Sequence, residues 1–284
     1  MKNTALFFVL VIAGSRCKSG EIKTVDPFRA IQPATVPDNR PALGNDTLND
    51  LYKIGKKYGY GYCYIQKNRK FKFTSSYEPD TGTKKWGLSP IDKSDKGTIE
   101  KIYMDIPDPS QLDPSVVYEV NQHLHGQTLI RYSYLSPGDR ILSYEITGLV
   151  EQEQTVFFHP PRLGYFKILE LNPFPYMLTA TQKTDRWRWQ LNAVSGYVFG
   201  DAKWRKWEGL IDIDETYKNA GRRKVYCKAV LRSVWCTKIQ AGAVSDLGKT
   251  SLVAYFNEQL GFVRLEYQNI DQSKLILELI ELPT

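Results

Sequence analysis

The sequence predicts an all-β fold: a single large antiparallel meander, curled into an open half-barrel or barrel, with few or no helices. Three observations predict this class. Aromatic residues, which favour strands, are frequent, with 18 Tyr, 12 Phe and 6 Trp among 284 residues. Short apolar segments, several of them alternating with polar residues, follow one another closely along the chain. The turn segments between them are too short for the crossover helices that parallel strands require.

Composition excludes several other classes. The chain is 42% hydrophobic and 24% charged, which is ordinary for a folded protein and excludes collagen-like, coiled-coil and wholly disordered chains. The net charge of +7 permits attraction to anionic surfaces without requiring nucleic acid.

The first sixteen residues have the features of a secretory signal peptide. Lys2 precedes an uninterrupted apolar run, residues 5–13, which is too short to span a bilayer. Cys17 follows at the place where a bacterial lipobox has its acylated cysteine. Gly14 and Ser15 fit that pattern, whereas Arg16 departs from it, because a small residue is usual there. We therefore expect lipidation of Cys17; the alternatives are secretion with cleavage nearby, or an uncleaved anchor.

Three segments are expected: a signal peptide (1–16), a lipid-anchored Pro-rich tether (17–45) and an antiparallel β domain (46–284). The tether contains four prolines and little periodicity. A short helix is possible near residues 47–57. No later apolar run approaches the length of a transmembrane helix.

The β domain begins with a predicted hairpin. Tyr58, Tyr60, Tyr62 and Tyr64 alternate with smaller residues, and a turn at residues 67–70 leads to Phe71 and Phe73. Residues 74–100 are polar and predict a long loop. The strands predicted after it are 116–121, 128–135, 141–149, 155–159, 165–171, 186–193, 209–214, 224–231, 235–241, 251–256, 261–268 and 274–282.

Turn chemistry separates several of these strands. The segments 137–139 (Pro-Gly-Asp), 219–221 (Asn-Ala-Gly) and 269–271 (Asn-Ile-Asp) are typical turn sequences. Residues 252–260 favour a hairpin, with a helix as the alternative because Leu252, Phe256 and Leu260 are four apart.

Short motifs resemble those of an uncharacterised group of secreted bacterial lipoproteins. They are His159-Pro160-Pro161-Arg162, Asn172-Pro173-Phe174-Pro175, Leu247-Gly248 and Gly261-Phe262-Val263-Arg264-Leu265-Glu266-Tyr267. The resemblance covers roughly residues 115–282 and implies a location in the bacterial cell envelope, on the periplasmic side or the cell surface. By architecture the pattern also resembles the half-barrel of lipoprotein carriers, which encloses an apolar cavity. That likeness is one of fold and does not determine function.

Histidines offer the one metal hypothesis. His123, His125 and His159 would supply a three-histidine zinc site if the chain brought them together. The alternative is that His123 and His125 lie exposed in a hairpin loop. His159 and Arg162 also flank two prolines, where Arg162 either clamps an anionic ligand or pairs with a neighbouring acid at a structural corner.

Three cysteines remain beyond Cys17. Cys227 and Cys236 either form a disulfide or stay reduced and buried, and Cys63 completes an odd count.

Cations and indoles alternate at two places. Trp187 and Trp189 share one face of their predicted strand, and Trp204 and Trp207 follow in a second basic cluster. These indoles either complete the core or line a recess for a ligand.

The sequence thus predicts an exported, lipid-anchored envelope protein without enzymatic activity that binds an apolar or amphiphilic ligand in its curled sheet. No catalytic motif, cofactor site or nucleic-acid partner is predicted. The ligand-binding candidates are Trp187, Trp189, Trp204, Trp207, His159 and Arg162. One rival is an interaction subunit of an envelope complex, with the basic, Tyr-rich hairpin of residues 50–73 as its contact surface. The other is a metal enzyme that uses the histidines.

Overall fold

The computed structural model describes residues 32–33, 49–77, 84–93, 95–114, 117, 127–152, 155–178, 186–194 and 210–282, and only the backbone of 32–33, 187–194 and 210. Several predictions therefore lie outside the described residues. They concern the signal peptide, Cys17, most of the tether, most of the 116–121 strand, His123, His125, Trp204 and Trp207.

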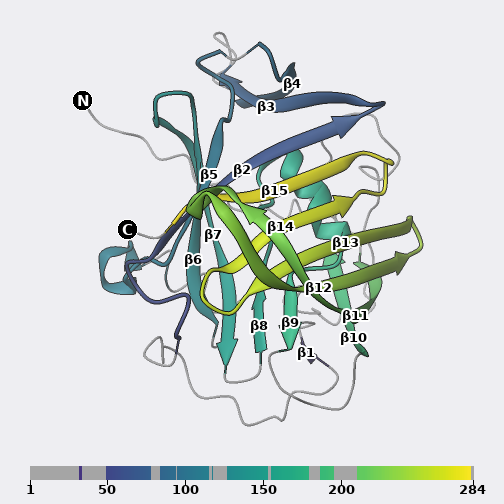
Figure 1. Cartoon of the computed structure of the whole chain (residues 1–284). Coiled ribbons are helices and arrows are strands. Elements are labelled where there is room, and N and C mark those ends of the chain that lie inside the picture. The colour runs from purple at the N-terminus through teal and green to yellow at the C-terminus, as the bar shows by residue number, and fades with distance from the viewer. Residues whose placement is uncertain are drawn as a thin grey trace, which may run out of the picture.

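One antiparallel sheet of fifteen strands makes up the molecule, curled into an open half-barrel (Figure 1). The predicted fold class is confirmed. Along the sheet the order is β1-β10-β11-β12-β13-β14-β15-β2-β5-β6-β7-β8-β9, so most strands pair with their sequence neighbours. The strands are β1 (Gln32–Pro33), β2 (Lys57–Gln66), β3 (Arg69–Tyr77), β4 (Lys84–Pro90), β5 (Lys101–Asp105), β6 (Thr128–Leu135), β7 (Ile141–Gln152), β8 (Thr155–Phe158), β9 (Tyr176–Leu178), β10 (Arg186–Val194), β11 (Leu210–Cys227), β12 (Arg232–Ser245), β13 (Gly248–Asn257), β14 (Gly261–Gln268) and β15 (Lys274–Glu281).

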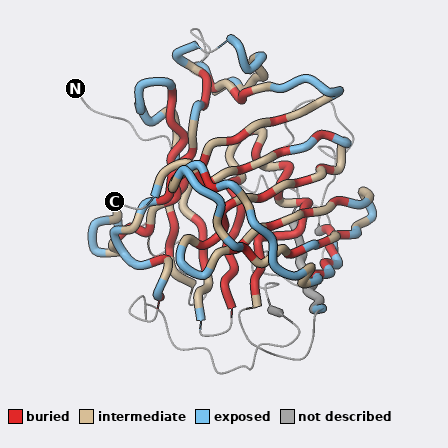
Figure 2. The backbone as a smooth tube through the Cα atoms, viewed as in Figure 1, coloured by how far each residue is buried: buried red, intermediate tan, exposed pale blue. Residues whose placement is uncertain are grey.

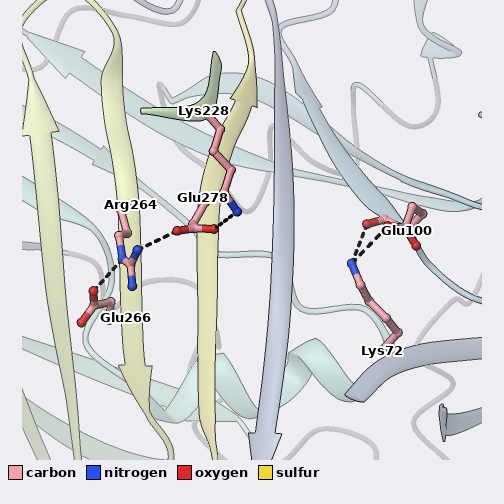
Figure 3. A network of polar contacts seen from close by, with 6 residues as sticks. All are labelled: Lys72, Glu100, Lys228, Arg264, Glu266 and Glu278. Carbon is pink, nitrogen blue, oxygen red and sulfur yellow. Dashed lines mark hydrogen bonds and ion pairs between the residues drawn. The ribbon is translucent and has the colours of Figure 1, made fainter. Parts of the chain in front are cut away.

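The sheet branches at β2. The first half of β2 pairs with β5, whereas its last three residues pair with β3, so the β3–β4 hairpin leaves the main sheet. The loop predicted for residues 74–100 is wrong in part, because β3 continues to Tyr77 and β4 follows. On β3, the Lys72 ammonium donates a hydrogen bond to the Glu100 carbonyl at 3.0 Å and lies 3.5 Å from the Glu100 carboxylate (Figure 3).

Many aromatic residues are buried in the core of the curled sheet. Figure 2 shows the buried positions in red, and along several strands they alternate with half-buried positions in tan. Tyr58, Tyr60, Tyr62 and Tyr64 of β2 are all buried. Period two places them on one face, and that face is the core. The tyrosines of the hairpin of residues 50–73 are therefore core residues, and only its cations, such as those of the exposed segment 67–70, are available for the proposed contact surface.

A 3-10 helix, η3 (Gly164–Leu171), replaces the strand predicted at 165–171. Its chain enters through Gly164 at φ +61°, a left-handed conformation that ends an extended run. Phe166, Ile168, Leu169 and Leu171 are buried against the concave side. Apolar content alone indicated burial here and did not distinguish a helical turn from a strand.

The strands predicted at 209–214 and 224–231 are two ends of one long strand, β11. The Asn-Ala-Gly segment between them is a β-bulge and not a chain-reversing turn, since β11 pairs with β12 on both sides of it. The Asn219 side chain accepts a hydrogen bond from the Gly221 amide at 2.9 Å, and Gly221 has φ +78°. The predicted hairpin at 252–260 and turn at 269–271 are confirmed.

Candidate functional site

The two ends of the sheet approach each other where β9 faces β11, and we call this place the β9–β11 junction: His159, Phe174, Tyr176, Glu215 and Tyr217. The Tyr176 and Tyr217 rings meet edge to face at 5.4 Å. The Tyr217 hydroxyl donates to the Phe174 carbonyl at 3.1 Å, and the Phe174 ring lies 5.3 Å from the His159 ring. Strand β9 and the residues just before it thus meet side chains of β11.

Glu215 is a carboxyl group in an apolar row. Ile211, Ile213, Glu215 and Tyr217 alternate along β11 and all are buried, with Glu215 only 1% exposed. Burial raises the pKa of Glu215 to about 8, while Tyr217 and the Phe174 backbone oppose this shift. The carboxyl group is therefore mostly protonated at neutral pH.

Hydrogen counting supports that protonation state. The Tyr217 hydroxyl lies within hydrogen-bond distance of both the Phe174 carbonyl and the Glu215 Oε2 atom. Tyr217 has one hydroxyl proton. Both contacts are satisfied together only when Glu215 carries a proton and donates it to Tyr217. Glu215 Oε1 then remains as an acceptor with no partner among the described residues.

His159 is the second buried polar group at the junction. Its side chain lies between the rings of Phe157 and Phe174, at 5.4 and 5.3 Å, and its Nε2 atom has no partner in the described part of the chain. Burial, and then the charge of Arg162, lower the pKa of His159 to about 3. The imidazole is neutral at physiological pH, so it is not poised for general acid–base work there.

Strand β10 brings two of the predicted tryptophans to this junction through its backbone. The register pairs Trp189 with Glu215 and Trp187 with Tyr217. On its other edge β10 pairs with β1, which belongs to the segment predicted as a tether. The predicted β10 strand is confirmed.

Arg162 does not join the junction. Its backbone amide donates to the Glu145 carboxylate at 2.8 Å, and its guanidinium lies 3.9 Å from the same group. The structural corner with a neighbouring acid is thus the alternative that the geometry supports. The sequence analysis does not single out Glu215, although its place in the Ile-x-Ile-x-Glu-x-Tyr alternation indicates a carboxyl group that faces the core.

Of the two alternatives for Cys227 and Cys236, the disulfide is absent from the structure. Cys63, Cys227 and Cys236 are unbonded, and the last two are buried. The register places Cys227 opposite Arg232 and Cys236 opposite Arg223, four residues further along. That offset, about 13 Å along a strand, exceeds the reach of a disulfide.

No group of three metal-ligating side chains occurs among the described residues, and His123 and His125 lie outside them.

Two surface hollows lie on the outer side of the sheet. One, of about 590 Å³, is lined in part by Tyr103, Asp105 and Arg131, and the latter two form an ion pair at 2.7 Å. The other, of about 470 Å³, is lined by Arg186, Thr216, Lys218, Gln240 and Gly242, besides Tyr217 and Ala241. Thr216 and Lys218, which line the second hollow, lie on the face of β11 opposite to Glu215. The first hollow is lined by an ion pair. Neither hollow is therefore the apolar recess that the sequence predicts.

Comparisons with known proteins place the chain near three solved structures. They are a proposed exported protein with a YmcC-like fold from Bacteroides fragilis (9% identity, 82% of this chain and 97% of that one, TM-score 0.38), a proposed lipoprotein from Parabacteroides distasonis (10%, 82% and 96%, 0.36) and the hypothetical lipoprotein YmcC from Escherichia coli (8%, 79% and 84%, 0.33). None of the three is described as a lipoprotein carrier, so the resemblance to that half-barrel gains no support. Likeness at this level carries no conclusion about function.

No family model and no curated protein matches the chain. Within the described ranges, no helix has the length and apolar character needed to cross a membrane.

Proposed function

We propose that the protein is an exported, lipid-anchored component of the bacterial cell envelope that binds a neutral amphiphile at the β9–β11 junction, without enzymatic activity. In this proposal residues 1–16 are removed, Cys17 is acylated, residues 17–45 form the tether and residues 46–284 form the binding domain. The observation that carries the proposal is the buried Glu215 carboxyl group, whose Oε1 atom has no hydrogen-bond partner among the described residues and lies among aromatic rings.

The chemistry of that oxygen selects the ligand class. A protonated carboxyl group whose proton is directed at Tyr217 offers its other oxygen as an acceptor. The matching ligand group is a donor, such as an alcohol or a quinol hydroxyl. An anionic headgroup would meet no cation among the junction residues, and leaving it buried and unpaired is costly. The rings of Phe174, Tyr176 and Tyr217 supply the apolar contact, and we propose that Trp187 and Trp189 add to it.

The test is a ligand screen on protein freed of lipid. Long-chain alcohols and quinols should raise the melting temperature and change tryptophan fluorescence, whereas fatty acids should do so less. A ligand at about one hundred times its dissociation constant should stabilise the fold by roughly 2.7 kcal/mol. Failure of every hydroxyl-bearing amphiphile to bind would refute the proposal.

Variants then locate the binding. Trp189→Ala and Glu215→Leu should weaken binding, since the first removes apolar contact and the second removes the acceptor oxygen at the junction. Glu215→Gln keeps both a donor and an acceptor there and should bind as the wild type does. Tyr144→Ala is the control, because Tyr144 is an aromatic residue that is 48% exposed on β7, outside the junction. Equal losses for Trp189→Ala and Tyr144→Ala would argue against the junction as the site.

The metal-enzyme alternative rests on His123, His125 and His159. Zinc analysis of the purified protein tests this alternative. A neutral, buried His159 can serve as a zinc ligand, but a three-histidine site also requires His123 and His125 to reach it. Co-purification from envelope extracts tests the alternative of an interaction subunit.

A further inference from the structure

The distal part of the β11–β12 hairpin forms a basic arm, defined here as residues 222–237. Around it, residues 216–245 contain seven Lys or Arg and no Asp or Glu, so this segment alone carries +7. The short 3-10 helix η5 (Lys228–Val230) connects the two strands at its tip. In Figure 2 the arm contributes pale-blue, exposed stretches that cross in front of buried strands.

The two faces of the arm differ sharply. Val225, Cys227, Val234 and Cys236 are buried or half-buried on one face. The opposite face is exposed and carries five side chains: Arg222, Lys224, Tyr226, Ser233 and Trp235. The solvent-facing side of an antiparallel hairpin is ordinarily polar, yet Tyr226 and Trp235 are 57% and 51% exposed, and Leu231 at the tip is 77% exposed.

Specific contacts hold the arm in this orientation over the outer side of β15. The Lys228 ammonium donates to Glu278 of β15 at 2.5 Å, and Glu278 also pairs with Arg264 at 2.6 Å, which in turn pairs with Glu266 (Figure 3). The Asn257 side chain donates to the Trp235 carbonyl at 2.9 Å. These contacts turn the face with Tyr226 and Trp235 toward solvent.

The cations of the arm are largely unneutralised. Among the described residues, Arg222 and Lys224 of the exposed face form no ion pair, nor do Arg223 and Arg232 of the other face, in contrast to Lys228. Arg222 and Lys224 instead lie 5.8 and 5.5 Å from the centre of the Trp235 ring. The surface therefore combines unpaired positive charge with an aromatic pair and an apolar tip.

We propose that this arm is a peripheral contact with an anionic lipid surface. Trp and Tyr settle at the level of lipid headgroups, and each Lys or Arg near an anionic leaflet is attracted to it. Leu231 at the tip is placed to enter the acyl boundary. A narrow two-stranded arm suits such shallow contact better than a stable protein interface, which takes about 800 Å² from each partner.

Binding to vesicles tests the proposal on the full chain. The protein should bind phosphatidylcholine vesicles that contain phosphatidylglycerol more tightly than pure phosphatidylcholine vesicles, and less tightly as salt is added. Arg222→Gln/Lys224→Gln should weaken binding to the anionic vesicles by about 30-fold, which is about 2 kcal/mol for two cations. Lys249→Gln/Lys274→Gln removes the same charge from exposed positions elsewhere and should change little.

A local probe separates the arm from the N-terminal segment. In a Cys17→Ser/Cys63→Ser background, an environment-sensitive fluorophore at Leu231→Cys should shift to the blue when anionic vesicles are added. The same fluorophore at Glu258→Cys, an exposed turn position, should not.

Three results would overturn the proposal: equal affinity for neutral and anionic vesicles, equal losses in the two charge variants, or an unchanged probe at position 231. Loss of a co-purified protein in the arm variants with vesicle binding intact would assign the arm to a protein partner instead. The outcome is independent of ligand binding at the β9–β11 junction, because no residue is shared between the two places.

Discussion

Glu215 illustrates how the protonation state of one buried side chain determines the hydrogen bonds of its neighbours. It lies on β11 between Ile213 and Tyr217 on the core-facing side, and it has no cation beside it among the described residues. A carboxyl group in such a place keeps its proton because the charged form would lose its hydration. The resulting hydrogen-bond pattern, with Tyr217 donating to Phe174, is what leaves one acceptor oxygen free.

Glu215→Gln should remove a penalty on stability that grows with pH. The unfolded chain releases the Glu215 proton above its ordinary pKa of 4.5, whereas the folded protein keeps it until about pH 8. The folded state thus binds more protons at this group in this window, so the contribution of Glu215 to wild-type stability falls as pH rises from 4.5 to 8, by up to about 1.4 kcal/mol per pH unit.

Chemical denaturation across that window measures the difference. Glutamine is neutral at every pH, so the variant should gain on the wild type steadily toward pH 8 and differ least near pH 4.5. The neutral His159 affects both proteins alike and cancels in the comparison. A difference in the free energy of unfolding that stays constant with pH would mean that Glu215 has its ordinary pKa in the folded protein and is ionised across the window.

At the scale of elements, Gly164 decides how η3 meets the β3–β4 hairpin. Gly164 has φ +61°, and a methyl group added there would lie 2.4 Å from the Trp86 ring of β4. Gly221, in the β11 bulge, also has positive φ, +78°, but the nearest atom to an added methyl group is 3.9 Å away. The two glycines therefore share a backbone requirement and differ in packing.

Gly164→Ala should cost more stability than Gly221→Ala. The left-handed backbone costs about 1–2 kcal/mol at either position, and the collision with Trp86 adds about 1–3 kcal/mol at Gly164 alone. Thermal or denaturant unfolding of both variants measures the difference. Gly164→Ala/Trp86→Ala should recover part of the loss, and the absence of any recovery would contradict the assigned contact.

For the whole molecule, we propose that location depends on Cys17 and on the arm. Two acyl chains on Cys17 would give stable anchoring, since each buried CH₂ contributes about 0.8 kcal/mol. Cys17→Ser should therefore move the protein from the membrane to the soluble fraction when membranes are washed at about 0.5 M salt, which screens the arm. Incorporation of labelled fatty acid in the native protein and its absence in the variant complete the measurement. A native protein that takes up no label would refute lipidation.

Much of the sheet was predictable because its information is local. Period-two alternation in β2, β6 and β14, and turn residues such as 269–271, report which side chains share a face and where the chain reverses. Alternation does not report how a strand bends, so the sequence predicts a turn at 219–221 where the structure has a bulge. It does not separate an apolar 3-10 helix from a strand either, so the sequence predicts a strand where the structure has η3.

The sequence by itself determined an antiparallel all-β fold, the faces of its alternating strands and the segments that join them. Only the tertiary structure decided that Glu215 and His159 meet at one junction, from strands that are not neighbours in the sheet, and that Arg162 turns to Glu145 instead. It also decided that the arm lies over β15 with Trp235 outward. The physical reason is that burial and protonation depend on groups brought together from distant parts of the chain, whereas periodicity records only the relation of each residue to its near neighbours.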